Sequence, residues 1–157
     1  MAGRERYGDG MDLTQFIDFT NLHGDGVLST LGPDGEPQAA YISIAAMDDG
    51  SLVFDAKADS RKIANIARDG RVAVVIGGRD GASVQCEGTA TVPVGEEHEK
   101  CAAAFIHRFP QFAVSVVSGA VVVHIRLVWA RVGEYVGEKF VFSEVKLSSG
   151  PSAHSAT

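Results

Sequence analysis

The sequence predicts a mainly β protein, a small antiparallel barrel flanked by short helices. Segments in which apolar and polar side chains alternate recur along much of the 157 residues, and this two-residue period is typical of strands. Tight turns such as Gly32-Pro33-Asp34-Gly35 separate these segments, so neighbouring strands run antiparallel. A chain of this length forms about one domain. Six to eight short strands in one small domain favour a barrel.

The first half of the chain predicts a helix followed by a meander of three strands. The helix covers residues 12–22, where Asp12 caps its start with Gln15 as the return partner, and Gly24 ends it. Beyond Gly24 the period changes to two. Strands are predicted over 27–31, 38–47 and 51–55, joined by turns at 32–35 and 48–50.

The second half predicts two more helices and four more strands. The helices cover 60–69 and 96–108, the second with acids at its start and bases at its end, as the helix dipole favours. The strands cover 71–76, 82–92, 120–135 (with a break near Gly133) and 139–145. We expect disordered ends at 1–10 and 148–157, which are polar and rich in glycine or serine, and a single domain over 11–147.

The charge and the apolar content of the sequence argue against several classes of function. The net charge of −6 argues against a general nucleic-acid binder. The longest apolar stretch, Gly119–Val123, is far short of the roughly 18 residues of a membrane span, and no secretory signal is visible. By their spacing, Cys86 and Cys101 form neither a disulfide scaffold nor a zinc cluster. We therefore expect a cytoplasmic protein with reduced thiols and no nucleic-acid or membrane partner.

The most informative segment for function is Asp59-Ser60-Arg61-Lys62, at the start of the predicted helix over 60–69. A helix start already carries about half a positive charge, yet two cations occupy its first turn. A bound anion removes this conflict, because backbone amides, the Ser60 hydroxyl and both cations would converge on one phosphate. The alternative is an exposed turn whose long side chains point into water.

The run VLSTLGPDGEPQAAYISIA, continued by DGSLVFDAKADSRKIANIARDGRVAVVIGG, resembles the pyridoxamine 5'-phosphate oxidase-like FMN-binding split barrels. The shared pattern is strand, DG-P turn, strand, DG turn and strand, then SRK, a helix with Asn65 and a glycine-rich loop. The resemblance is strongest over 25–92 and weaker up to 136. It implies a six-stranded antiparallel split β-barrel of Greek-key type that forms a homodimer, with one FMN at each of two subunit interfaces.

The resemblance also implies which residues bind the cofactor. Arg61 and Lys62 match the basic pair that holds the FMN phosphate, and residues 40–45 match the strand that runs along the flavin. The complete expected FMN-binding set is Tyr41, Ile42, Ser43, Asp55, Ala56, Ser60, Arg61, Lys62 and Ser83. No catalytic side chain is predicted, because the flavin itself carries the chemistry.

The favoured function is a flavoprotein that passes a hydride or electrons between a reduced donor and a small-molecule acceptor. Ala40 and Ala45 stand where the true oxidase has basic residues, and residues 132–138 do not match its substrate motif, which argues against vitamin B6 oxidation. The alternatives are a non-enzymatic flavin-binding redox sensor or carrier, and a relative that binds the deazaflavin F420 or haem.

Three further features bear on possible metal and cofactor ligands. His98, Cys101 and His107 share one predicted helix, but the two histidines are nine residues and about 900° apart, so they face opposite sides and predict no metal site. We interpret His124 as a wall or interface histidine rather than a cofactor ligand. We interpret Trp129 as core or dimer packing rather than a flavin stacking partner.

Overall fold

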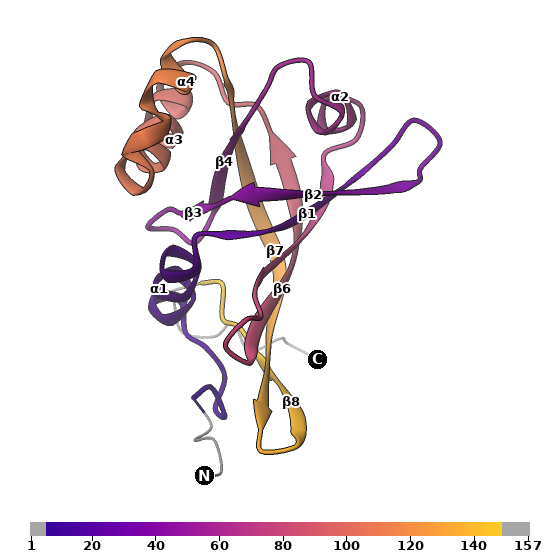
Figure 1. The fold of residues 1–157 in the computed structure, drawn as a ribbon, viewed down its shortest axis with the longest axis vertical. Coiled ribbons are helices and arrows are strands. Elements are labelled where there is room, and N and C mark those ends of the chain that lie inside the picture. Colours follow the sequence, from indigo (N-terminus) through magenta and orange to yellow (C-terminus); the bar gives the residue numbers. More distant parts are fainter. Residues whose placement is uncertain (1–5, 149–157) are drawn as a thin grey trace.

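The computed structural model describes residues 6–148 as one curled antiparallel sheet with helices packed on it (Figure 1). The predicted mainly β split barrel is confirmed. The strand order is β2-β1-β5-β6-β7-β4-β3, and β8 pairs with β7. The elements are α1 (Leu13–His23), β1 (Asp25–Leu31), β2 (Pro37–Ser43), β3 (Ala45–Ala46), β4 (Leu52–Ala56), α2 (Arg61–Arg68), β5 (Arg71–Gly77), β6 (Ala82–Thr91), α3 (Gly95–Arg108), α4 (Ala113–Val117), β7 (Val121–Val136) and β8 (Lys139–Glu144).

The start and end of α1 follow from the sequence as predicted. The Gln15 backbone N–H donates to Asp12 Oδ1 at 2.8 Å, and the Asp12 N–H donates to Gln15 Oε1 at 2.9 Å. Gly24 ends the helix with a φ of 72°, a left-handed conformation that glycine adopts without strain. The helix buries Phe16 and Phe19.

The strand predicted over 38–47 is two strands, and the bend between them closes the barrel. β2 pairs with β1, whereas β3 pairs with β4 at the other end of the strand order. Between them, the fully buried Ile44 donates its N–H to the carbonyl oxygen of Gly24 at 2.9 Å. If β2 and β3 are counted as one bent strand, this strand and β1, β4, β5, β6 and β7 are the six strands of the split barrel. β8 pairs with β7 outside this set.

Two other predictions about single elements were wrong. β7 has no break at Gly133, which instead allows the Phe140 ring to cross close by: a Cβ at this position would lie 2.5 Å from that ring. The residues after α3 form a 3-10 turn, Pro110–Phe112, and the short helix α4, so residues 6–148 contain four α-helices where three were predicted. α4 has five residues and no side-chain cap, which leaves little local signal in the sequence.

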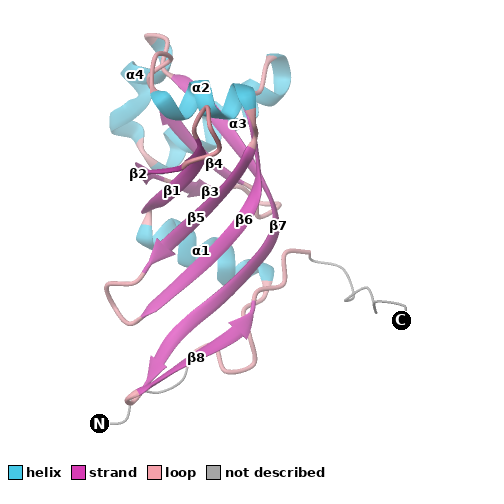
Figure 2. Cartoon of the chain, turned by 90° about the vertical axis from the view of Figure 1, so that its right-hand side faces the viewer, coloured by secondary structure: helices cyan, strands magenta, loops and turns pink. Residues whose placement is uncertain are grey.

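The core is centred on β4, which is covered on both faces. Leu52, Val53 and Phe54 are all fully buried, because α3 packs on β4 from outside the barrel. Figure 2 shows α2, α3 and α4 gathered at one end of the strands and the β7–β8 hairpin at the other. None of the helices within residues 6–148 combines the length and apolar character that crossing a bilayer requires.

The first described residues attach to the sheet through a buried acid. The backbone N–H groups of Arg6 and Tyr7 donate to Glu134 Oε1 at 3.1 and 2.8 Å. The predicted disorder at residues 1–5 and 149–157 lies outside the described residues.

Candidate cofactor site

The start of α2 holds a buried hydroxyl that has no hydrogen-bond partner among the described residues. Ser60 occupies the N-cap position with an extended backbone, but its side chain makes no capping hydrogen bond. Its Oγ atom is buried and unpaired. A buried polar group without a partner costs about 1–3 kcal/mol. The N-cap of α2 therefore holds a hydroxyl donor that the described residues leave without a partner.

A cavity of about 240 Å³ adjoins this helix start. Arg61 and Lys62 are the charged residues of its wall, and both belong to the first turn of α2. The lining residues are Leu28, Thr30, Gln38, Ala39, Ala40, Arg61 and Lys62. Two cations and the positive end of a helix dipole around one small cavity favour an anion the size of a phosphate.

Asn65 fixes α2 over the β1–β2 hairpin. Its side chain is 2% exposed, and Nδ2 donates to Thr30 Oγ1 and to Gln38 Oε1, both at 2.9 Å. Arg68 donates in turn to Asn65 Oδ1 at 3.3 Å. An eight-residue helix is not stable by itself in water, so these contacts hold the first turn against the cavity.

Asp55, at the end of β4, is the carboxylate beside this cluster. Burial raises its pKa, and the positive charge of Lys62 acts in the opposite direction. Asp55 and Lys62 are therefore close enough for their charges to interact. Ala56, the next residue, is buried and pairs with Val121 in the sheet.

The structure does not gather all predicted cofactor residues around one cavity. Side chains alternate along β2, so Ala40 faces the cavity whereas Tyr41 and Ser43 point to the opposite face. Ile42 is 6% exposed and belongs to the core. Ser83 lies on β6, which β1 and β5 separate from β2. Within one chain, the helix start brings together Asp55, Ser60, Arg61 and Lys62.

The sequence analysis missed Thr30 and Gln38, and it named Asn65 only as part of the shared helix pattern, with no role in the site. Thr30 lies on the buried face of β1, which it shares with Leu28. A polar residue in such a position was the available signal, because it needs a hydrogen-bond partner from another element. The partner, Asn65, is 35 positions away in the chain, so the sequence could not identify it.

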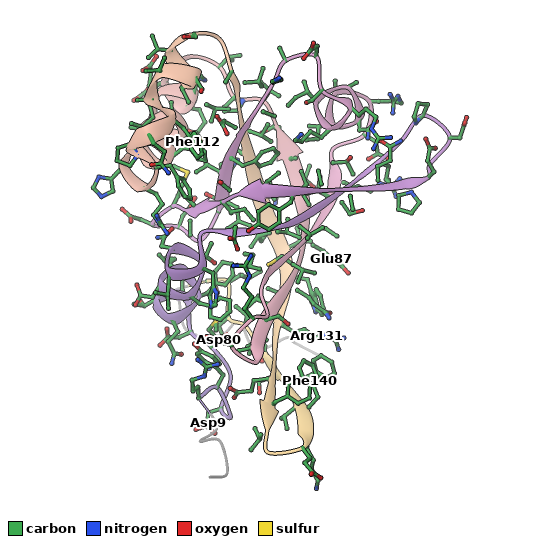
Figure 3. All side chains as sticks on the ribbon, in the orientation of Figure 1. Asp9, Asp80, Glu87, Phe112, Arg131 and Phe140 are labelled. Carbon is green, nitrogen blue, oxygen red and sulfur yellow. The ribbon has the colours of Figure 1, made fainter. Side chains whose placement is uncertain are left out.

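Exposed aromatic residues surround Arg131 on β7 and β8. The Arg131 guanidinium carbon lies 3.9 Å from the centroid of the Phe142 ring and 5.7 Å from that of Trp129. Figure 3 shows Arg131 and Phe140 along this hairpin. Trp129 is 40% exposed, so it does not belong to the core of the single chain. The interpretation of Trp129 as core packing is wrong, and dimer packing stays a prediction.

Comparison with protein families identifies the chain. The model of the pyridoxamine 5'-phosphate oxidase family matches residues 14–135. The chain belongs to this family. Comparison with curated proteins gives no match. The family match covers every element from α1 to nearly the end of β7.

Solved structures share the fold. A conserved hypothetical protein from Mycobacterium tuberculosis is 26% identical, with a TM-score of 0.68 over 84% of this chain and 90% of that one. A pyridoxamine 5'-phosphate oxidase-related, FMN-binding protein from Nostoc punctiforme is 13% identical, with a TM-score of 0.61 over 85% and 94%. A haem-binding protein from Mycobacterium smegmatis is 19% identical, with a TM-score of 0.67 over 85% and 61%.

Proposed function

We propose that this protein binds FMN and acts as a flavin-dependent oxidoreductase on small molecules. The observation that carries the proposal is the buried Ser60 hydroxyl, which has no partner within residues 6–148 and directly precedes Arg61 and Lys62 at a helix start. This donor set fits a phosphate monoester, the anionic end of FMN. The family also contains FMN-binding members, such as the Nostoc punctiforme protein.

In this proposal each residue has a defined task. Arg61 and Lys62 neutralise the phosphate charge, and the Ser60 hydroxyl and the free backbone N–H groups of the first turn donate to its oxygens. Asn65 positions this turn without contacting the cofactor. The bound FMN supplies hydride or single-electron transfer, and the protein contributes binding and orientation.

A homodimer is part of the same proposal. The cavity at α2, about 240 Å³, is smaller than the roughly 300–1,000 Å³ of a usual ligand pocket, so most of an FMN lies outside it. A second chain can enclose the remainder. The outward face of β1 and β5 exposes Val27 and Val75, which are direct neighbours in the sheet and each 43% exposed. Apolar side chains grouped on a sheet face favour an interface between two copies.

The cofactor assignment is tested with Lys62→Ala and, as its matched control, Lys57→Ala. Both variants remove one lysine, but Lys57 is exposed in the loop before the helix and lies outside the cavity lining. Loss of a charged hydrogen bond costs about 1.5–3 kcal/mol, so Lys62→Ala should weaken FMN binding about 10- to 100-fold. Titration of flavin fluorescence measures the Kd of each variant for FMN. Equal affinity of the two variants would refute the phosphate assignment.

The absorption spectrum of the purified protein separates the cofactor classes. Flavin maxima, with FMN identified by mass after heat release, support the proposal. A Soret band instead of flavin maxima supports haem, as in the haem-binding relative by fold, and contradicts it. Sustained turnover with NADH or NADPH and a panel of small acceptors supports the enzyme. Tight FMN with only slow oxidation by air supports a redox sensor or carrier.

A further inference from the structure

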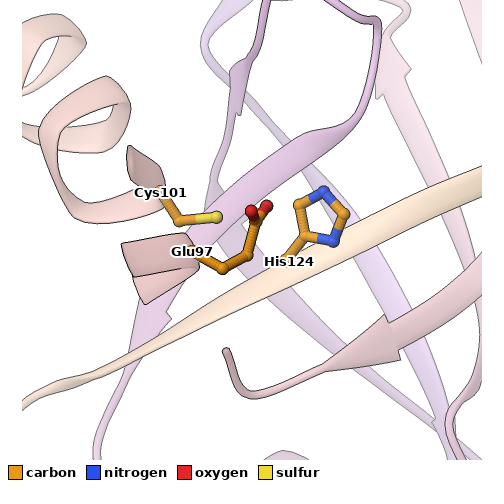
Figure 4. Close-up of side chains that lie close together, drawn as sticks. All are labelled: Glu97, Cys101 and His124. Carbon is orange, nitrogen blue, oxygen red and sulfur yellow. The ribbon is translucent and has the colours of Figure 1, made fainter. Parts of the chain in front are cut away.

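A second cluster of chemically active side chains lies between α3 and β7. Glu97 and Cys101 belong to α3, and His124 belongs to β7. A carboxylate oxygen of Glu97, the Sγ atom of Cys101 and a ring nitrogen of His124 all lie within 4.8 Å of one another. Figure 4 shows the Glu97 carboxylate between the Cys101 sulfur and the His124 ring.

The fold builds this cluster from two rigid elements. Glu97 and Cys101 are four residues apart, so they share one face of α3. That helix packs against β4 and β7. His124 is held by ladder pairing on both sides, opposite Val53 in β4 and Thr91 in β6. The three ligand atoms therefore meet without a flexible loop between them.

Two carboxylates and a buried thiol lie close to one another at the cluster. Cys101 is fully buried. Burial, and then the charges of Glu97 and Asp49, raise the pKa of its thiol to about 11. Burial alone would raise the pKa of Asp49, but hydrogen bonds from Ser51 and the nearby His124 imidazole hold it below its ordinary value. Two carboxylates beside a thiol and an imidazole favour the arrival of a cation.

We propose that Glu97, Cys101 and His124 bind a divalent transition-metal ion of the Zn²⁺ class. Thiolate, imidazole and carboxylate are the ligands that Zn²⁺ takes in proteins, and three of them leave the fourth position open. With bonds of about 2.0–2.3 Å, tetrahedral ligand atoms lie about 3.3–3.7 Å apart. The three ligand atoms lie within 4.8 Å of one another, so rotations of the side chains bring them to this separation. Binding displaces the Cys101 proton to solvent.

A cavity of about 200 Å³ adjoins His124, and its wall includes Asp49, Gly50 and Ser51. Asp49 brings a carboxylate to this wall and Arg126 a guanidinium, so the cavity beside His124 carries charges of both signs. The site is separate from the α2 cavity, which has none of these residues in its lining.

The test is Co²⁺ and Zn²⁺ binding by the purified full-length chain after treatment with a chelator. Each absorption spectrum is taken as a difference against the same sample before metal is added, so that any bound flavin cancels. The variants are Glu97→Gln, Cys101→Ser and His124→Gln. The controls are His98→Gln, next to Glu97 on α3, and Cys86→Ser, the other buried cysteine. Thermal unfolding checks that each variant is folded.

We expect one Co²⁺ per chain, a thiolate-to-cobalt charge-transfer band, and displacement of Co²⁺ by Zn²⁺. Loss of an outer-shell partner alone lowers metal affinity about 10- to 100-fold. Loss of a ligand should therefore lower it at least about 100-fold for Cys101 and His124, and at least about tenfold for Glu97. The controls should bind as the unmodified chain does. Absence of the band, or equal affinity in Glu97→Gln and His98→Gln, would overturn the proposal. The exposed Glu97 can be replaced without disturbing the core, so this comparison holds even if Cys101→Ser fails to fold.

Discussion

Replacing Ser60 by alanine should stabilise the ligand-free protein and weaken its binding of FMN. Removing a serine N-cap usually costs about 0.5–2 kcal/mol, because a capping hydrogen bond is lost. Ser60 makes no such bond, and its buried Oγ has no partner in the described part of the chain. An unpaired buried hydroxyl costs about 1–3 kcal/mol, so its removal should raise the free energy of unfolding by about 1 kcal/mol.

The same substitution should weaken FMN binding, although it stabilises the ligand-free protein. If the hydroxyl donates to a phosphate oxygen, its loss removes a hydrogen bond to a charged group, which contributes about 1.5–3 kcal/mol. The Kd for FMN should then rise about 10- to 100-fold. Urea unfolding of the protein stripped of cofactor measures the first effect, and flavin fluorescence titration measures the second.

The control is Ser115→Ala, at an exposed position in α4, which should change stability by less than about 0.5 kcal/mol and leave FMN binding unaltered. The ligand-free Ser60→Ala protein could instead be less stable by 0.5 kcal/mol or more, which is about the cost of a lost N-cap. That result would show that the hydroxyl has a partner in the chain. An unchanged Kd would show that the hydroxyl does not contact the cofactor. Either result refutes the reasoning from the unpaired atom.

Four other predictions follow from the same structure. Phe54→Ala should lower the free energy of unfolding by about 3–5 kcal/mol, because the ring is fully buried; a loss under about 1 kcal/mol in urea unfolding contradicts this. Asn65→Leu should cost about 1–3 kcal/mol by the same measurement, because its two hydrogen-bond acceptors lose their donor; an unchanged midpoint would mean that α2 is held by other contacts. Val75→Glu should turn the proposed dimer into monomers with an unchanged circular dichroism spectrum, and light scattering that still gives a dimer would place the interface elsewhere. Burial raises the pKa of the Cys101 thiol from 9.0 to about 11, so the unfolded chain ionises first. The contribution of this thiol to stability is complete below pH 9 and falls by about 1.4 kcal/mol per pH unit up to about pH 11. In the chelator-treated chain Cys101→Ser should remove this part of the slope and leave the part that belongs to Cys86, whose pKa burial raises to about 12. An unchanged slope would assign it to other groups.

Several features of the protein could be predicted from its sequence because they depend on residues that are close together in the chain. The capping box at Asp12 and the left-handed Gly24 bound α1, because both depend on residues within one turn of the helix. The two-residue period placed β1, β5 and β6 within a residue or two of their observed bounds. The cationic start of α2 also showed in the sequence, because its charge conflict with the helix dipole lies within four consecutive residues.

Contacts between distant segments were decided only by the tertiary structure. The division of 38–47 into β2 and β3 arises because the two halves pair with different strands, which no pattern within the segment records. Asn65 finds Thr30 across 35 positions, and the thiol of Cys101 meets His124 rather than either histidine of its own helix. A helix or strand period fixes which way a side chain points, whereas its partner depends on how the whole sheet curls. For this reason the sequence by itself determined the fold class and a cationic helix start, and the folded chain decided which side chains surround each site.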